Sequence, residues 1–227
     1  MSGKDKFAFV FVEVTGDRPL LMARMDVDLL LNAGTTSKRD KTAPQLTTRE
    51  IAQKLLYADA TGRLYFPTTG IARMLREAGG AHKMRGERKS VKYKVPAAVL
   101  LMQDEMFLHH PDTGKPIVDP NWEVDVRSGV NSVTKARIPI CRPRIERWAT
   151  KFQLRINQDV LPEELIHRLL DDAGEQLGLG AFRPERGGTF GLFRVTKWQK
   201  EIKKTEPEEV PEKAPKKGKN TTPVAAE

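Results

Sequence analysis

Residues 178–198, GLGAFRPERGGTFGLFRVTKW, form a glycine-rich loop that runs into an alternating strand. Glycines free a backbone to take conformations that other residues avoid, so such a loop could approach a flat or charged ligand closely. Arg183 and Arg186 stand in the loop where a phosphate would lie. In the strand, Phe190, Leu192 and Trp198 fall on one side, and Phe193 and Val195 on the other. The stretch therefore suggests contact with nucleic acid.

The residues before the loop complete a unit of strand, helix, glycine loop and strand. FQLRI, residues 152–156, alternates as a strand does, and Pro162 opens a helix in which apolar residues recur at helical spacing as far as Leu177. The ending of the glycine loop and the order of the elements exclude two familiar phosphate-binding loops. The glycines do not end in the GK[ST] of a P-loop, and they follow a helix instead of connecting a strand to one, as a dinucleotide fold requires.

The unit resembles the C-terminal half of the RAMP superfamily, the ferredoxin-like RNA-binding subunits of CRISPR effector complexes. Similar loops also occur in phage and prophage proteins. The residues that carry the resemblance are Gly178, Gly180, Arg183, Gly187, Gly188, Gly191 and Phe193, and with the preceding helix they cover roughly a fifth of the chain. The resemblance implies an α+β fold with a ferredoxin-like antiparallel sheet, helices on one face and inserted hairpins or loops. It also implies binding of single-stranded nucleic acid across the sheet and the glycine loop, often by repeated copies.

The rest of the chain is compatible with such a fold. FAFVFVEV, residues 7–14, is apolar on both alternating sets, which predicts a central strand buried on both faces. Thr47 and Glu50 have the spacing of a capping box and predict a helix that ends near 59–62. Further predicted elements are a strand over 20–31, a loop over 32–46, a helix over 67–80, a strand over 95–101, an excursion over 103–119 and alternation over 122–126.

Positive charge is concentrated in the body of the chain. The net charge is +9, and residues 201–227 contain six lysines and six glutamates, so the whole excess belongs to the first 200 residues. Two dense basic runs, 83–94 and 127–147, favour a polyanionic partner. The residues expected to bind nucleic acid are Lys83, Arg85, Arg88, Lys89, Lys92, Arg127, Lys135, Arg137, Arg142, Arg144, Gly180, Arg183, Arg186, Gly187 and Gly188.

Other chemistry is not indicated. The single cysteine, Cys141, allows no intramolecular disulfide and no cysteine-based zinc site, which fits a reducing, cytoplasmic setting. No stretch is long and apolar enough to predict a membrane span. The four histidines suggest no metal site, no cofactor and no catalytic residue. Tyr93 and Trp148 could stack on bases, although core packing is the more usual role of a tryptophan beside a strand.

We therefore expect one nucleic-acid-binding domain over 1–199 and a disordered tail over 200–227. The leading hypothesis is a non-enzymatic protein that binds single-stranded RNA or DNA, RNA favoured, with partners that include further copies of itself or effector-complex subunits. Two alternatives stay open. One is a metal-independent endoribonuclease of the same fold, with one histidine as general base. The other is a phage structural or assembly protein whose basic arms contact an acidic partner.

Overall fold

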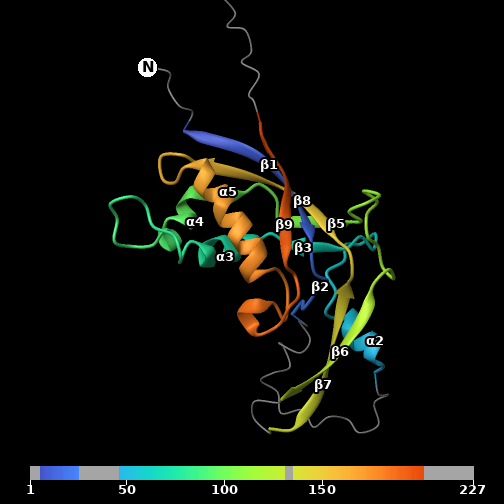
Figure 1. The fold of residues 1–227 in the computed structure, drawn as a ribbon. Coiled ribbons are helices and arrows are strands. Elements are labelled where there is room, and N and C mark those ends of the chain that lie inside the picture. Colours follow the sequence, from blue (N-terminus) through green and yellow to red (C-terminus); the bar gives the residue numbers. More distant parts are fainter. Residues whose placement is uncertain (1–5, 26–45, 131–134, 202–227) are drawn as a thin grey trace, which may run out of the picture.

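Strand β1 (Phe7–Gly16) lies inside an antiparallel sheet, between β8 (Ala149–Asn157) and β9 (Phe193–Lys200). The computed structural model describes residues 6–25, 46–130 and 135–201. The strand order is β3–β5–β8–β1–β9, and β4 also pairs with β8 (Figure 1). The remaining strands of this sheet are β3 (Tyr65–Pro67), β4 (Val99–Leu101) and β5 (Glu105–His109). Strand β9 is the last strand on its side of the sheet.

The chain order of these elements is that of a ferredoxin-like fold. After β1 comes helix α3 (Thr69–Ala78), then β4 and β5, then β8, then helix α5 (Glu163–Asp172), and last β9. In space β9 lies beside β1, β1 beside β8, and β8 beside β4 and β5. Helices α3 and α5 pack against each other on one face of the sheet (Figure 1). The predicted α+β, ferredoxin-like class is confirmed.

Alternate residues of β1 are buried in the core, on the face of the sheet that the helices cover, and the residues between them lie on the other face. In β1 the residues Ala8, Val10, Val12 and Val14 are buried, and they meet the apolar sides of α3 and α5. Phe7 and Phe11 of the same strand are 36% and 37% exposed on the opposite face. The prediction that 7–14 is buried on both faces is therefore wrong, because both helices cover the same side of the sheet.

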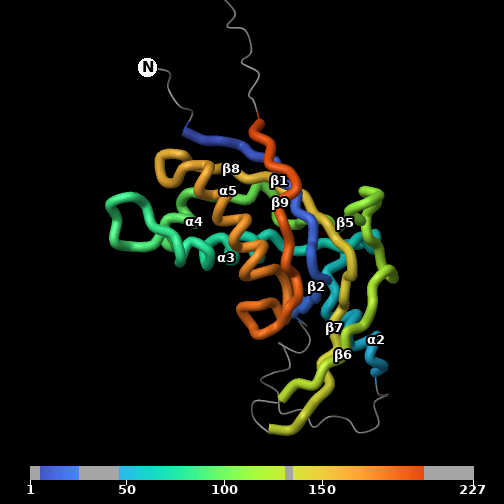
Figure 2. The backbone as a smooth tube through the Cα atoms, viewed as in Figure 1, coloured from blue at the N-terminus to red at the C-terminus, as the bar shows by residue number. Residues whose placement is uncertain are grey.

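A second, three-stranded sheet has the order β2–β7–β6. It consists of β2 (Leu20–Leu21), β6 (Glu123–Val130) and β7 (Arg137–Ile145), and the β6–β7 hairpin extends away from the main sheet (Figure 2). Helix α2 (Thr48–Gln53) packs on this hairpin. It begins with the predicted capping box, in which Glu50 N donates to Thr47 Oγ1 at 3.2 Å and Thr47 N donates to Glu50 Oε2 at 2.7 Å.

Several predicted boundaries differ from the structure. Helix α2 ends at Gln53, earlier than expected, and β2 covers only the start of the predicted strand 20–31. The stretch 95–101 divides into helix α4 (Val95–Ala98) and β4, because Pro96 suits the first turn of a helix. The excursion 103–119 contains β5. Residues 32–45 of the predicted loop over 32–46 and residues 202–227 of the predicted tail over 200–227 lie outside the described residues, and Lys200 still belongs to β9.

Three short helical turns complete the structure. A 3-10 turn, η1 (Val91–Tyr93), precedes α4, and a π turn, η2 (Ala173–Leu177), extends α5 into the glycine-rich loop. A second 3-10 turn, η3 (Pro184–Arg186), lies inside that loop. The predicted order of strand, helix, glycine loop and strand is confirmed. None of the helices in the described parts of the chain is both long and apolar enough to cross a membrane.

Candidate nucleic-acid interface

The glycine-rich loop, residues 178–192, folds against β2 and against itself. Ala181 N donates to Leu21 O at 2.9 Å, and Gly191 N donates to Pro19 O at 2.8 Å. A Cβ on Gly180 would lie 2.4 Å from Leu21 O, and one on Gly191 would lie 1.8 Å from Leu179 O. These two glycines, with φ of 78° and 72°, are therefore needed for the loop's own close packing.

The backbone N–H groups expected to hold phosphate are largely used inside the loop. Gly187 N donates to Pro184 O at 2.9 Å and Gly188 N to Arg183 O at 3.1 Å. A Cβ on Gly188 would lie 1.7 Å from Phe182 O, whereas Gly187 has no neighbouring atom within 4 Å of that position. The loop would therefore offer a ligand its side chains and its shape more than its N–H groups.

The two arginines of the loop have different surroundings. Arg183 donates to Glu185 Oε2 from Nε at 2.9 Å and from Nη2 at 2.5 Å, and from Nη1 to Gly180 O at 2.9 Å. Its guanidinium therefore braces the loop. Arg186 is exposed, and its guanidinium makes no hydrogen bond or ion pair with any described residue. Of the pair, Arg186 is the one available to an anion.

A groove of about 640 Å³ lies between the glycine-rich loop, helix α3 and strand β7. From α3 it is lined by Thr69, Gly70, Arg73, Met74 and Glu77, whose spacing places them on one side of the helix. Arg142 of β7 and Arg186 line it as well. We call this the loop groove.

The charges around the loop groove favour an anionic ligand. Arg73, Arg142 and Arg186 form no ion pair among the described residues. The two acids of the lining are already engaged: Glu185 by Arg183, and Glu77 by Lys92 Nζ at 2.7 Å. The hydrogen bond from Lys92 lowers the pKa of Glu77, so this carboxylate stays ionised and neutralised by its partner. Three guanidinium groups are left to face the groove.

The first basic run forms a loop beyond the C-terminal end of α3. His82 Nε2 lies 2.6 Å from Asp172 Oδ2 and ties the start of the run to α5. Lys92 is occupied by Glu77, and Lys94 Nζ donates to Glu87 at 2.5 Å. The cations of this run that are exposed and without an ion pair among the described residues are Lys83, Arg85, Arg88 and Lys89.

The second basic run follows the β6–β7 hairpin. Arg127 donates to Asp125 Oδ2 at 2.7 Å and lies over the rings of Phe190, at 4.6 Å, and Phe182, at 5.0 Å. Arg144 pairs with Glu146 at 2.5 Å. These two arginines therefore stabilise the hairpin and its contact with the glycine-rich loop. Lys135 and Arg137 are exposed near the tip, and Arg142 alone reaches the loop groove.

The two aromatic residues that were considered for stacking differ in their exposure. Trp148 is fully buried and its Nε1 donates to Arg18 O at 2.9 Å, so it anchors the core and is no stacking platform. Tyr93 is 74% exposed. Sequence reasoning missed the exposed Phe7 and Phe11, because a run that is apolar on both alternating sets gives no sign of which side the helices cover.

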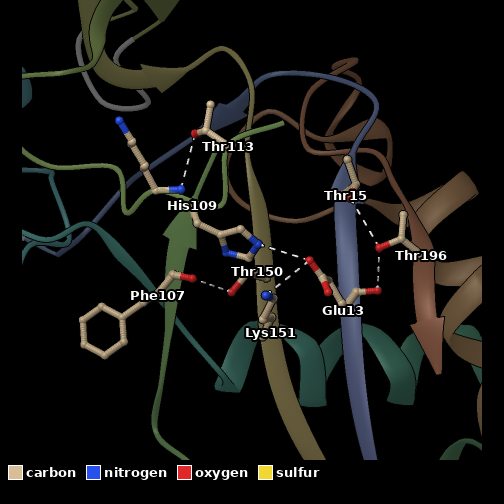
Figure 3. A network of polar contacts seen from close by, with 9 residues as sticks. Glu13, Thr15, Phe107, His109, Thr113, Thr150, Lys151 and Thr196 are labelled. Atoms are coloured by element: carbon tan, nitrogen blue, oxygen red, sulfur yellow. Dashed lines mark hydrogen bonds and ion pairs between the residues drawn. The ribbon is translucent and has the colours of Figure 1, made fainter. Parts of the chain in front are cut away.

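The histidines form no metal centre in the described part of the chain, where no group of three His, Cys, Asp or Glu side chains could hold an ion. His109 is the histidine that joins a polar network on the open face of the sheet (Figure 3). Its Nε2 lies 3.3 Å from Glu13 Oε1, and Lys151 Nζ lies 3.6 Å from the same oxygen. Thr196 Oγ1, on β9, donates a hydrogen bond to the backbone oxygen Glu13 O and so extends the network to that strand.

No protein-family model matches the chain, and no curated protein does. Among solved structures, it is similar to a chain of "Cryo-EM structure of the Type III-B Cmr-beta bound to cognate target RNA", with 16% identity and a TM-score of 0.49 over 86% of this chain. It spans 61% of that chain. It is also similar to Cmr6 from Pyrococcus furiosus, with 12% identity and a TM-score of 0.43, over 83% of this chain and 98% of that one.

Proposed function

We propose that this protein binds single-stranded nucleic acid, RNA in particular, with the phosphate backbone in the loop groove. The observation that carries the proposal is the set of three guanidinium groups, of Arg73, Arg142 and Arg186, which face one groove while both acids of its lining are neutralised. A guanidinium presents its donors in a fork that matches two phosphate oxygens at once. Three of them on different elements suit a backbone that bends through the groove.

Two further groups of cations would extend this contact. Lys83, Arg85, Arg88 and Lys89 lie beyond one end of α3, and Lys135 and Arg137 lie near the hairpin tip. A ligand that reaches them from the loop groove must be long and repeatedly charged, as a nucleic-acid strand is. RNA is the strand to test first, because the Cmr-beta structure contains target RNA. Assembly of several copies along one strand, or with effector-complex subunits, belongs to the same proposal.

The test is a salt titration of binding to a fluorescein-labelled 12-nucleotide RNA, followed by fluorescence anisotropy. For single strands, log K falls with log salt by about 0.7 for each phosphate contact. The variant Arg73→Gln/Arg142→Gln/Arg186→Gln should therefore lower the slope by about 2 if each arginine contacts one phosphate. Binding should weaken alike for all sequences, because phosphate contacts carry no base preference.

A control variant of equal charge separates this site from general attraction. Lys54→Gln/Lys115→Gln/Arg168→Gln removes three exposed cations that lie outside the groove. This control should leave the slope close to that of the wild type. Equal effects of the two variants would refute the groove as the site, and no binding at low salt would refute the function itself. In that second case, an acidic protein partner, as in the phage assembly alternative, becomes the hypothesis to pursue.

Assembly along a strand has its own measurement. If several copies bind one RNA, the number of proteins per strand in sedimentation experiments should rise with RNA length. A constant ratio of one would argue against it while leaving binding intact.

A second candidate function, cleavage of bound RNA without metal, is favoured by one observation. His109 lies beside Glu13, and Lys151 lies beside the same carboxylate, on the open face of the sheet (Figure 3). A histidine held by a carboxylate can act as general base. Here it would take the proton of a ribose 2′-OH while that oxygen attacks the adjacent phosphorus and the 5′-oxygen leaves with a proton from water. Cleavage that persists with chelator and is lost in His109→Ala would support the activity, and intact RNA after prolonged incubation would refute it.

A further inference from the structure

The face of the main sheet turned away from the helices carries a stripe of phenylalanines. Phe7, Phe9 and Phe11 follow one another on this side of β1, the strand between β8 and β9. Alternate residues of a strand are about 6.7 Å apart, so the three rings form a row along the sheet. Leu100 of β4, 48% exposed, lies on the same face opposite Arg155. We call this surface the phenylalanine face.

Cations lie over the rings at both ends of the row. The Arg155 guanidinium is 5.0 Å from the centre of the Phe7 ring, and Lys197 Nζ is 5.7 Å from the centre of the Phe11 ring. Lys6 Nζ is 5.5 Å from the centre of the same Phe7 ring. None of these three cations forms an ion pair with a described residue. Each exposed end of the aromatic row thus has free positive charge beside it.

Of the acids on this face, Glu105 lies on β5, which β8 separates from β1, and the two acids nearer the phenylalanines are engaged by neighbours. Glu13 lies near both His109 and Lys151 (Figure 3), and Glu201 accepts a hydrogen bond from Gln153 Nε2 at 3.0 Å. The side chains left for a ligand are therefore flat apolar rings and cations in alternation. A single-stranded nucleic acid has the matching parts, because each of its bases has a face that stacks and each of its linkages has a negative charge.

We propose that the phenylalanine face is a base-stacking platform, on which bases of a single strand stack against Phe7 and Phe11 while Arg155 and Lys197 hold the adjoining phosphates. The proposal rests on the proposed nucleic-acid binding and assigns it a second surface, on the opposite side of the sheet from the loop groove. The charge pattern favours this ligand over a protein, whose apolar patch would have to bury Arg155 and Lys197 with no acid of the described residues to pair them.

The experiment compares two ligands of equal charge. One is a labelled 12-nucleotide uridine RNA, and the other is the same backbone with abasic residues throughout. Stacking changes affinity by about 5- to 140-fold for each base. The wild type should therefore bind the uridine RNA at least about tenfold more tightly than the abasic strand. Phe7→Leu/Phe11→Leu should abolish this preference and leave the affinity for the abasic strand, and its salt slope, unchanged.

Leucine keeps an apolar side chain on the strand, and a further variant controls the ring. Phe11→Tyr retains a ring and should retain the preference. Urea unfolding of each variant shows whether the fold is kept. If Phe7→Leu/Phe11→Leu is unfolded, the comparison of Phe11→Tyr with Phe11→Leu decides alone.

The outcomes separate this proposal from the binding function. Equal affinity of the wild type for both ligands, with the expected salt dependence, would overturn the stacking platform and leave the loop groove standing. Binding of neither ligand would overturn both. A wild-type dimer that Phe7→Leu/Phe11→Leu converts to monomer without changing RNA affinity would assign the face to a second copy of the chain and also overturn the platform.

Discussion

Gly187 and Gly191 allow the role of the glycine-rich loop to be measured, because they share a conformation and differ in their surroundings. Their φ angles are 73° and 72°, so alanine at either position carries the cost of a left-handed conformation, about 1–2 kcal/mol. At Gly187 nothing lies within 4 Å of the added Cβ. Gly187→Ala should therefore lower the free energy of unfolding by about that amount and no more.

At Gly191 the added Cβ would lie 1.8 Å from Leu179 O, so the backbone must move. Movement distorts two hydrogen bonds, from Gly191 N to Pro19 O and from Leu179 N to Gly191 O, both 2.8 Å long. Each such bond contributes about 0.5–1.5 kcal/mol. With the conformational cost, Gly191→Ala should lower the free energy of unfolding by about 2–5 kcal/mol.

The assay is urea unfolding, in which a change of midpoint at constant slope reports a change of stability. Gly187→Ala should also keep the RNA affinity of the wild type, because the Gly187 N–H still donates to Pro184 O. Equal loss of stability in the two variants would refute the reasoning. So would a loss of RNA binding in Gly187→Ala without loss of stability, since that result would give the glycine a direct part in holding the ligand.

Three further predictions concern stability. Hydrogen bonds from Thr61 and Arg63 lower the pKa of Asp59 in the folded protein to about 2. The stability that these bonds contribute is therefore complete above about pH 4 and is lost as the pH falls toward 2. The urea midpoint of Asp59→Asn should depend less on pH across that window than the midpoint of the wild type. Trp148→Ala should cost about 3–5 kcal/mol by urea unfolding, because it empties a fully buried site. Arg127→Lys should cost about 1 kcal/mol by the same assay, because lysine replaces the planar contacts with Asp125, Phe182 and Phe190 by a point charge; an unchanged midpoint would mean that the hairpin does not depend on this contact.

Local patterns in the sequence were enough to predict the C-terminal unit and the start of α2. The period of the apolar residues distinguishes the strand at 152–156 from the helix after Pro162, and the capping box needs only Thr47 and Glu50. Strand β5 was missed because its five residues are followed by prolines and a turn, and it is secured by distant partners, such as the bond from Thr150 Oγ1 to Phe107 O.

The candidate site could be predicted only in part, because the sequence shows charges and not their partners. Arg183 has Glu185 two residues away, a pairing that the sequence makes visible. Lys92 is engaged by Glu77, which is fifteen residues away, and Arg142 reaches the loop groove only through the β6–β7 hairpin. Nothing in the sequence singled out Arg73 as a site residue, because it is one exposed arginine of an amphipathic helix. Contacts of this kind depend on the tertiary fold.

The place of β9 at the end of the main sheet has a consequence for the behaviour of the protein in concentrated solution. An unpartnered strand is a template for another strand, and copies of a protein can adhere along such edges. Arg194 and Lys200 of this strand pair with Asp17 and Glu163, whereas Lys197 forms no ion pair with a described residue. Two copies that approach edge to edge would bring their Lys197 ammonium groups together, and these would repel each other. A polyanion removes that repulsion by neutralising the charges. Light scattering should therefore show the protein dispersed by itself and associating when a sub-stoichiometric amount of long RNA is added, with high salt reversing the association.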